Sequence, residues 1–262
     1  MELQLKGKNA LVCGSSQGIG LASAIELSKL GANIILLARN REGLERALQK
    51  LDSSQGQDHC YFLADFADSS NVPAAIDQIK SRSLRVQIIV NNTGGPAGGK
   101  LIEARADELD RTFRMHVINN HYLAQAFWED MKSEGFGRIV NIVSTSVKQP
   151  IPGLGVSNTI RWAVASWAKT LANELGPFGI TVNNVLPGYT RTARLDAVFS
   201  MRAKEQGKPG EEVARHLAST IPTGRFAEAS EVAAAVAFLC TPAAGSINGI
   251  NLPVDGGSTG SL

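Results

Sequence analysis

Short apolar runs alternate with longer helical patterns along most of the chain. The runs are rich in Leu and β-branched residues, and several are apolar on both faces, which is typical of strands buried on both sides of a parallel sheet. The predicted strands are 9–13, 33–38, 60–63, 87–91, 138–143, 181–186 and 250–254. The predicted helices are 18–30, 42–51, 72–82, 106–134, 154–175 and 230–239. This alternation predicts right-handed βαβ crossovers and a doubly wound α/β sheet.

Residues 192–224 are the least regular part of the chain. They contain the polar stretch EQGKPGEE, and we expect them to form a mobile loop over a substrate site. The chain has no Pro/Ser-rich linker, repeat or low-complexity segment, so the pattern predicts a single domain over residues 1–262.

Composition and charge predict a folded globular protein and argue against other classes of protein. Hydrophobic residues make up 44% and charged residues 19% of the 262 positions, which is typical of a folded globular chain. The 26 Lys and Arg residues are scattered and nearly balanced by 24 Asp and Glu, so we expect neither a nucleic-acid nor a membrane partner. There is no signal-like or membrane-spanning apolar run, and Cys13, Cys60 and Cys240 lack CxxC spacing. These features predict a cytoplasmic protein with no structural zinc or other metal site.

A glycine-rich loop follows the first predicted strand and precedes an apolar helix. It runs from Gly14 to Gly20 and has Gly18 between them, with the sequence GSSQGIG. Backbone N–H groups at a helix N-terminus hold the pyrophosphate of a dinucleotide, and side chains there would block its approach. The alternative is a tight turn with no ligand, but the position in the first βαβ unit favours the dinucleotide.

The second predicted strand is followed by Arg39, Asn40 and Arg41. A site for NAD usually has an acidic residue here, whereas a basic residue accommodates the 2′-phosphate of NADP(H). Arg39, with Arg41 as a possible second contact, therefore favours NADPH. The alternative is that both arginines simply begin a solvated helix.

Several further motifs resemble those of one family. They are Asp65-Phe66 in LADFAD, Asn91-Asn92-Thr93-Gly94, the GRIVNIVS strand that ends at Ser144, Pro187-Gly188 with Thr192, IPTGRF at 221–226 and LPVDGG at 252–257. Together with the glycine loop they resemble the short-chain dehydrogenase/reductase family, in its 3-oxoacyl reductase-like members, over essentially the whole chain. The resemblance implies a single-domain Rossmann fold with a seven-stranded parallel sheet, and a homotetramer or dimer assembled through the two long helices.

The same resemblance assigns the site. The implied cofactor-binding residues are Gly14, Ser16, Gly18, Ile19, Gly20, Arg39, Asp65, Phe66, Asn92, Gly94, Arg161, Pro187, Gly188 and Thr192. The family's catalytic residues are an Asn, a Ser and a Tyr-x-x-x-Lys pair. Ser144 matches the serine, but Ser157 stands at the tyrosine position and Arg161 at the lysine position. His116 best matches the Asn.

These replacements change the expected proton chemistry. A serine hydroxyl is a far weaker acid than a phenol, whose pKa is about 10, and an arginine stays protonated. Arg161 can still hold ribose hydroxyls or an anion. His116 is a candidate proton donor near neutral pH, with a structural histidine as the alternative. Tyr189 is a further candidate acid, or else packs against cofactor or substrate.

The expected function is reduction of a small-molecule substrate by hydride transfer from NADPH, with an atypical proton donor. The reduced group is a ketone or 3-oxoacyl carbonyl, or a conjugated enone, in which Ser144 and Ser157 stabilise the enolate. The alternative is a nucleotide-binding sensor or scaffold that holds the cofactor without turnover.

Overall fold

Seven parallel strands form the central sheet of the computed structural model, in the order β3-β2-β1-β4-β5-β6-β9. The structure describes residues 1–261, apart from the side chains of residues 197, 201, 202, 205 and 206. The strands are β1 (Asn9–Cys13), β2 (Asn33–Ala38), β3 (Cys60–Leu63), β4 (Ile88–Asn91), β5 (Gly137–Ile142), β6 (Ile180–Pro187) and β9 (Asn251–Val254). The seven predicted strands and the doubly wound α/β class are therefore confirmed.

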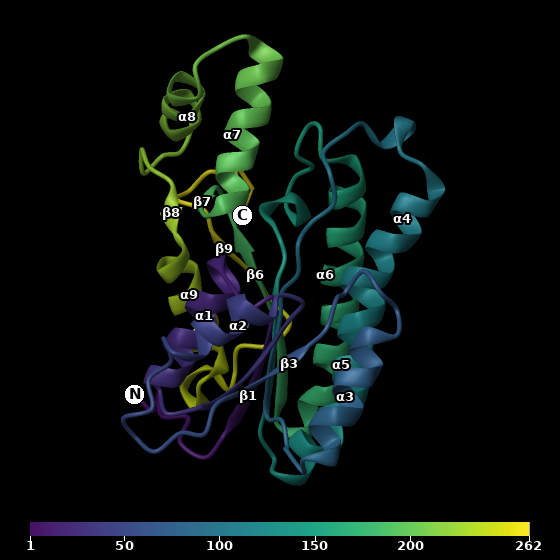
Figure 1. The fold of residues 1–262 in the computed structure, drawn as a ribbon, viewed down its shortest axis with the longest axis vertical. Helices are drawn as coiled ribbons and strands as arrows, with labels where there is room; N and C mark the ends of the chain where they lie inside the picture. Colours follow the sequence, from purple (N-terminus) through teal and green to yellow (C-terminus); the bar gives the residue numbers. More distant parts are fainter. Residues whose placement is uncertain (262) are drawn as a thin grey trace.

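Helices cover both faces of this sheet. On one face lie α1 (Gly18–Lys29), α2 (Arg41–Leu48) and α9 (Ala229–Cys240), and on the other α3 (Asn71–Ser81), α5 (Asn119–Ser133) and α6 (Gly155–Leu175) (Figure 1). Successive strand residues point to opposite faces of the sheet. Val12 therefore packs in the apolar core beneath α1, α2 and α9, and Leu11 packs in the core beneath α3, α5 and α6. Strands with two buried faces explain why their sequences read as continuous apolar runs.

The single long helix predicted over 106–134 is interrupted. It consists of α4 (Ala106–Phe113), a π-helical turn (Arg114–Ile118) and α5. A π-turn adds one residue to a helical turn and rotates the side chains that follow, and such turns are frequent at functional sites. His116 lies within this turn.

Residues 192–224 are more regular than predicted. They contain α7 (Ala193–Gln206) and α8 (Gly210–Ser219), joined at Gly207, whose φ of 62° ends α7 in the left-handed conformation. The prediction of an irregular loop is thus wrong, because the polar EQGKPGEE stretch contains the end of α7, a connection of residues 207–209 and the start of α8. Val213 and Leu217 of α8 pack in a small apolar cluster of their own.

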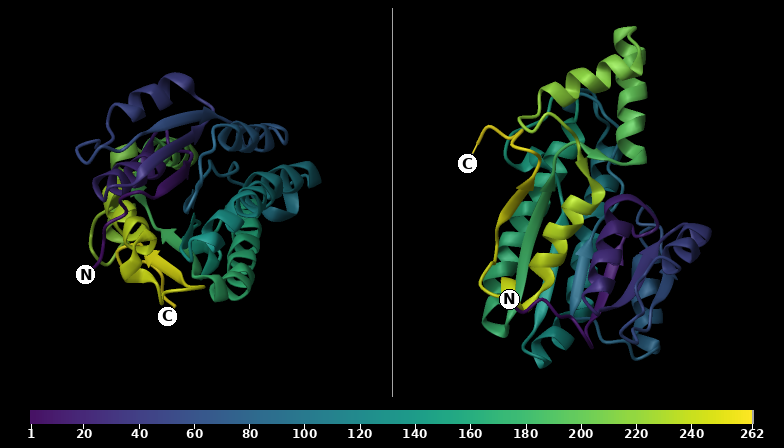
Figure 2. Two further views of the ribbon diagram at one scale, coloured as in Figure 1. Left: turned by 90° about the horizontal axis from the view of Figure 1, so that it is seen from below. Right: turned by 90° about the vertical axis from the view of Figure 1, so that its left-hand side faces the viewer.

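These two helices stand apart from the main body. Figure 2 shows α7 and α8, in light green, projecting beyond the carboxyl ends of the strands. A short parallel pair, β7 (Thr190–Arg191) with β8 (Ala227–Glu228), closes the base of the projection. The predicted mobility of this segment stays a prediction.

The described residues lack two kinds of feature. None of their helices is both long enough and apolar enough to traverse a bilayer. Within the same residues, no three His, Cys, Asp or Glu side chains are grouped so that they could hold a metal ion.

Candidate functional site

Two adjoining cavities open at the carboxyl edge of the sheet. The glycine-loop cleft, of about 720 Å³, is lined by the loop after β1 and by the residues after β2, β3 and β4. The serine cavity, of about 510 Å³, is lined by the residues after β5 and β6 and by the start of α6. The residues common to both are Ile19, 92–95, Thr192 and Arg194. The two cavities therefore form one continuous site.

The glycine loop presents bare backbone at the start of α1. Gly14 and Gly18 have φ of 58° and 59°, in the left-handed region that favours glycine. A Cβ at Gly14 would lie 2.7 Å from Nδ2 of Asn92, and one at Gly20 would lie 2.8 Å from the same atom. The residue before the helix, Gln17, makes no side-chain cap, so the first N–H groups of α1 remain available to an anion.

Two side chains hold this loop in place. The hydroxyl of buried Ser15 accepts a hydrogen bond from the N–H of Leu37 at 3.0 Å, and Asn92 donates to the carbonyls of Cys13 and Gly14 at 3.4 and 3.3 Å. Ser16 lines the cleft as expected, whereas the structural role of Ser15 was missed. Gly20 lines neither cavity and instead allows close packing against Gly14.

Arg39, Asp65 and Phe66 line the far end of the glycine-loop cleft. The Arg39 side chain is 74% exposed, and its contact of 3.5 Å with Asp65 is long for an ion pair. Its guanidinium is thus available to a ligand. Arg41 lines neither cavity, because it donates to the Tyr61 hydroxyl at 3.1 Å. Of the two predicted arginines, only Arg39 therefore faces the cleft.

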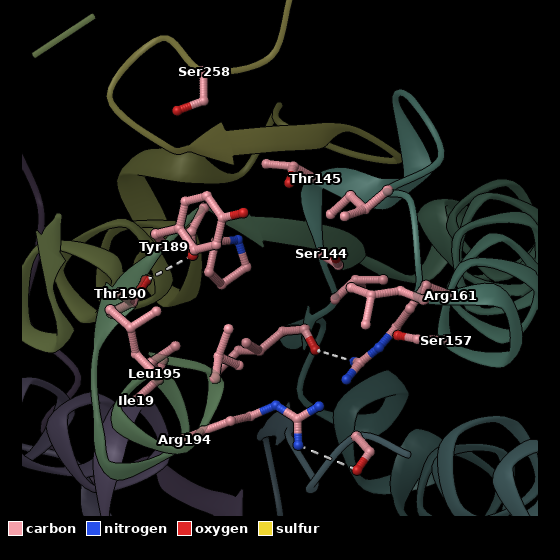
Figure 3. A pocket seen from close by; sticks show the side chains of 18 of the residues that line it. Ile19, Ser144, Thr145, Ser157, Arg161, Tyr189, Thr190, Arg194, Leu195 and Ser258 are labelled. Atoms are coloured by element: carbon pink, nitrogen blue, oxygen red, sulfur yellow. Dashed lines mark hydrogen bonds between the residues drawn. The ribbon is translucent and has the colours of Figure 1, made fainter. Parts of the chain in front are cut away.

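The two predicted serines lie on one wall of the serine cavity. Figure 3 shows Ser144, Ser157 and Arg161 on this wall, with Tyr189 across from them. The Ser144 oxygen accepts the N–H of Ser146 at 3.0 Å, so the hydroxyl proton of Ser144 is free to be donated to a ligand. Ser157 is buried, one helical turn before Arg161 on α6.

Arg161 is a buried cation. Nη1 of its guanidinium donates to the carbonyl of Ile142 at 3.0 Å. Burial, and then the charge of Arg194, lower the pKa of Arg161 to about 10. It therefore remains charged at neutral pH. Arg194 had not been predicted; the available signal was a second basic residue beside Thr192, just where a helix begins.

The structure bears on the predicted role of His116. The side chain is 3% exposed and lines neither cavity, and its Nε2 has no hydrogen-bond partner among the described residues. Burial first, and then the charge of Arg161, hold the pKa of His116 well below its usual value, although a hydrogen bond with the Gly94 backbone acts the other way. Burial outside both cavities does not favour the predicted role of His116 as a proton donor near neutral pH, and that role stays a prediction.

The opposite wall follows β6. The N–H of Gly188 donates to the carbonyl of Val254 at 3.1 Å, and a Cβ at Gly188 would lie 2.7 Å from that of Asp255. Pro187, Gly188 and Thr192, which are predicted to bind the cofactor, line the serine cavity. Tyr189 also lines it, with its ring edge-on to Phe226 at 6.3 Å.

Comparisons with known proteins agree with this geometry. Residues 14–259 match the sequence model of a family described as Enoyl-(Acyl carrier protein) reductase. The chain is 33% identical over 254 residues to 3-oxoacyl-(acyl-carrier-protein) reductase FabG of Haemophilus influenzae, with 97% of this chain and 98% of the relative covered.

Solved structures share the whole fold. L-sorbose reductase from Gluconobacter frateurii, in complex with NADPH and L-sorbose, is 30% identical with a TM-score of 0.93 and full coverage of both chains. A structure described as a short chain dehydrogenase/reductase family protein is also 30% identical, with a TM-score of 0.80 and 99% of each chain covered.

Proposed function

The chain belongs to the short-chain dehydrogenase/reductase family, and from this premise we propose that it is an NADP(H)-dependent oxidoreductase that reduces a carbonyl or a conjugated enone. The observation that carries the proposal is the continuity of the two cavities through Ile19, residues 92–95 and Thr192. A dinucleotide in the glycine-loop cleft would place its reactive end beside Ser144 and Ser157. When bound, the nicotinamide would supply the hydride.

The glycine-loop cleft fits a phosphorylated dinucleotide. The left-handed backbone at Gly14 and Gly18, which excludes bulky side chains, and the uncapped start of α1 suit a pyrophosphate. Arg39 lies where the adenosine ribose of such a cofactor is expected, and it can pair with a 2′-phosphate. Relatives with bound NADPH, such as the L-sorbose reductase, support the same choice.

Ser144 and Ser157 are proposed to donate hydrogen bonds to the oxygen on which negative charge develops. Because the Ser146 N–H already occupies a lone pair of Ser144, that hydroxyl is oriented before substrate arrives. Hydrogen-bond donors fixed in advance stabilise a developing oxyanion without a cost of reorientation.

Two reactions fit this site, reduction of a ketone and reduction of a conjugated enone. Ketone reduction requires a proton at oxygen, and Tyr189 is the phenol that lines the cavity. Enone reduction needs stabilisation of an enolate, to which two hydroxyl donors and nearby positive charge contribute, and the enolate carbon then takes a proton from solvent. The name of the 3-oxoacyl reductase corresponds to ketone reduction, and the description of the matched family, an enoyl reductase, corresponds to enone reduction.

The test is oxidation of NADPH against a matched panel of ketones and conjugated enones, with NADH in parallel. We expect turnover of members of one class, with NADPH preferred. Tight NADPH binding without oxidation in the presence of any panel member would instead support the alternative of a silent sensor or scaffold.

We also propose a homo-oligomer, a tetramer or a dimer, assembled through α5 and α6. Trp162 of α6 and Tyr122 of α5 are 50% and 39% exposed, which is high for large aromatic side chains. Light scattering at micromolar concentration is expected to give a multiple of the chain mass, and a monomer would contradict the proposal.

A further inference from the structure

Two guanidinium groups reach into the serine cavity. Arg161 reaches it from α6 and Arg194 from α7, and Figure 3 shows both side chains directed into the same space. None of the described residues that line this cavity is Asp or Glu. In the described part of the chain, neither arginine forms an ion pair.

The two charges converge on Gly95. Nη2 of Arg194 and Nη2 of Arg161 lie 3.1 and 3.5 Å from the position that a Cβ at Gly95 would occupy. Arg194 is held there by hydrogen bonds to the carbonyls of Gly95 and Pro96, at 3.3 and 3.2 Å. The absence of a side chain at Gly95 thus lets two like charges approach each other at one end of the cavity.

This arrangement is unfavourable for the protein alone. A buried cation without a counter-charge is destabilising, and a second cation beside it adds repulsion. The lowered pKa of Arg161 reflects both causes, yet the group keeps its charge at neutral pH. One N–H of Arg161 is used by Ile142, so the rest of the planar fork is available to an anion.

We propose that the substrate is a small carboxylic acid, with its carboxylate held between Arg161 and Arg194 and its reducible bond at Ser144 and Ser157. This inference rests on the proposed function and names the substrate class for it. Arg161 follows Ser157 by one helical turn, so their Cβ atoms are about 5–6 Å apart. Both side chains line the same cavity, so one small molecule can place its carboxylate at Arg161 and its reducible C=O or C=C at Ser157.

The other residues that line the cavity indicate the shape and polarity of the rest of this acid. Ile151, Leu154 and Leu195 line the cavity with apolar side chains. A short hydrocarbon chain or ring fits this surface, since apolar contact there is favourable. A neutral thioester at the reacting end would leave both arginines without a partner, so the free acid is the preferred form.

The alternative is that these two arginines bind the cofactor instead of the substrate. Arg194 also lines the glycine-loop cleft, and Arg161 stands where a residue that binds ribose is expected. A cofactor role predicts that substitution weakens NADPH binding. A substrate role predicts that it weakens binding of a carboxylate to the cofactor complex. The two can therefore be measured separately.

The test uses the full chain saturated with NADP+ and titrated by calorimetry with benzoate or benzamide, which have nearly the same shape but differ in charge. Benzoate is expected to bind about 10–100-fold more tightly, as for a charge-assisted bidentate contact. Arg161→Gln and Arg194→Gln should each bring this ratio close to one while the affinity for benzamide is kept. Arg114→Gln, on an exposed arginine outside both cavities, should leave the ratio unchanged.

Equal affinity for the two ligands, or no binding of either in the millimolar range, would overturn the proposal. So would an unchanged ratio in both variants together with weakened NADPH binding, because the arginines would then serve the cofactor. If Arg161→Gln does not fold, Arg194→Gln decides, since that side chain is exposed. Benzoate binding requires no turnover, so failure of the NADPH oxidation test would overturn the proposed function separately.

Discussion

Asn91 and Asn141 lie opposite each other on β4 and β5, and Nδ2 of Asn91 donates to Oδ1 of Asn141 at 2.8 Å. The same bond recurs at 2.8 Å from Asn141 to Asn184 of β6, and at 2.8 Å from Asn184 to Asn251 of β9. This row of four amides links β4, β5, β6 and β9, from the last residue of β4 to the first residue of β9. It therefore ties together the four strands whose following residues line the serine cavity.

Removal of a central amide should be costly. Asn141→Ala leaves the buried Asn91 donor and the buried Asn184 acceptor without partners, so we expect the free energy of unfolding to fall by about 2–4 kcal/mol. Asn251→Ala, at the half-buried end of the row, affects one bond and should cost less. Urea denaturation of both variants measures the difference, and equal losses would show that the row does not act as a unit.

Cofactor preference should depend on Arg39. Arg39→Asp removes the proposed partner of the 2′-phosphate and adds repulsion, so NADPH affinity should fall by at least about 10-fold and the preference should reverse toward NADH. Arg41→Asp is the matched control, because Arg41 contacts Tyr61 and lines neither cavity. Fluorescence titration with both nucleotides measures this. Equal wild-type affinity for NADH and NADPH would contradict the assignment.

The sheet was predictable because its strands are apolar on both faces, a pattern that local sequence records directly. The π-turn was not predictable, since one extra residue barely disturbs the period of a long helix. The helices α7 and α8 were missed because Gly and Pro at 207–210 dominate this window of the sequence. Its few apolar positions pack in a small separate cluster with Ile221 and Phe226.

The candidate site likewise has residues that could be predicted from local sequence and residues that could not. Residues that belong to a sequence motif, such as Gly14 and Ser144, could be predicted from sequence, and both line the cavities. Arg194 could not, because its role depends on α7 bringing it over Gly95, which is distant in sequence. The environment of His116 likewise depends on its burial near Arg161 and Gly94. The spacing of residues along the sequence does not indicate which side chains are buried, so this environment could not be predicted.

The stability of the fold at acid pH should depend on the charge of Glu231. Two hydrogen bonds of 2.7 Å from Arg225, and one from the Glu228 N–H, lower the pKa of Glu231 to about 2. Because the folded-state pKa is below the ordinary value, this carboxylate stabilises the fold above about pH 4.5, and the contribution is lost as pH falls toward 2. Glu231→Gln should be less stable at pH 7 and should lose less stability over that interval.

Thermal unfolding from pH 7 down to the acid limit tests this expectation. Glu129→Gln, which removes a carboxylate from an exposed pair of 3.9 Å with Lys132, is the control and should follow the wild type. A Glu231→Gln profile parallel to the wild type would show that the pair with Arg225 does not govern acid unfolding.

His116 should affect stability below neutral pH. Its folded-state pKa is lower than its unfolded one, so the unfolded chain takes up the proton first and stability declines as pH falls below about 6.5. The decline is at most about 1.4 kcal/mol per pH unit for one group. His116→Asn should remove this slope, whereas His216→Asn, on the exposed face of α8, should keep it. Urea denaturation between pH 5 and 7 measures the slope, and an identical slope in both variants would exclude His116 as its origin.

Turnover should depend on the two serine hydroxyls. If Ser144 and Ser157 hold the developing oxyanion, removal of either by substitution with Ala should lower the turnover number by about 10²–10³, as for other oxyanion donors. NADPH affinity should change little, because the glycine-loop cleft is lined by other residues. Thr159→Ala is the control, since Thr159 is exposed on the same helix and lines neither cavity. The double variant should be no more than slightly worse than the worse single variant if both hydroxyls act on one oxygen as a unit. Single-turnover rates measured with a substrate found in the panel decide the matter, and a fully active double variant would remove both serines from the mechanism.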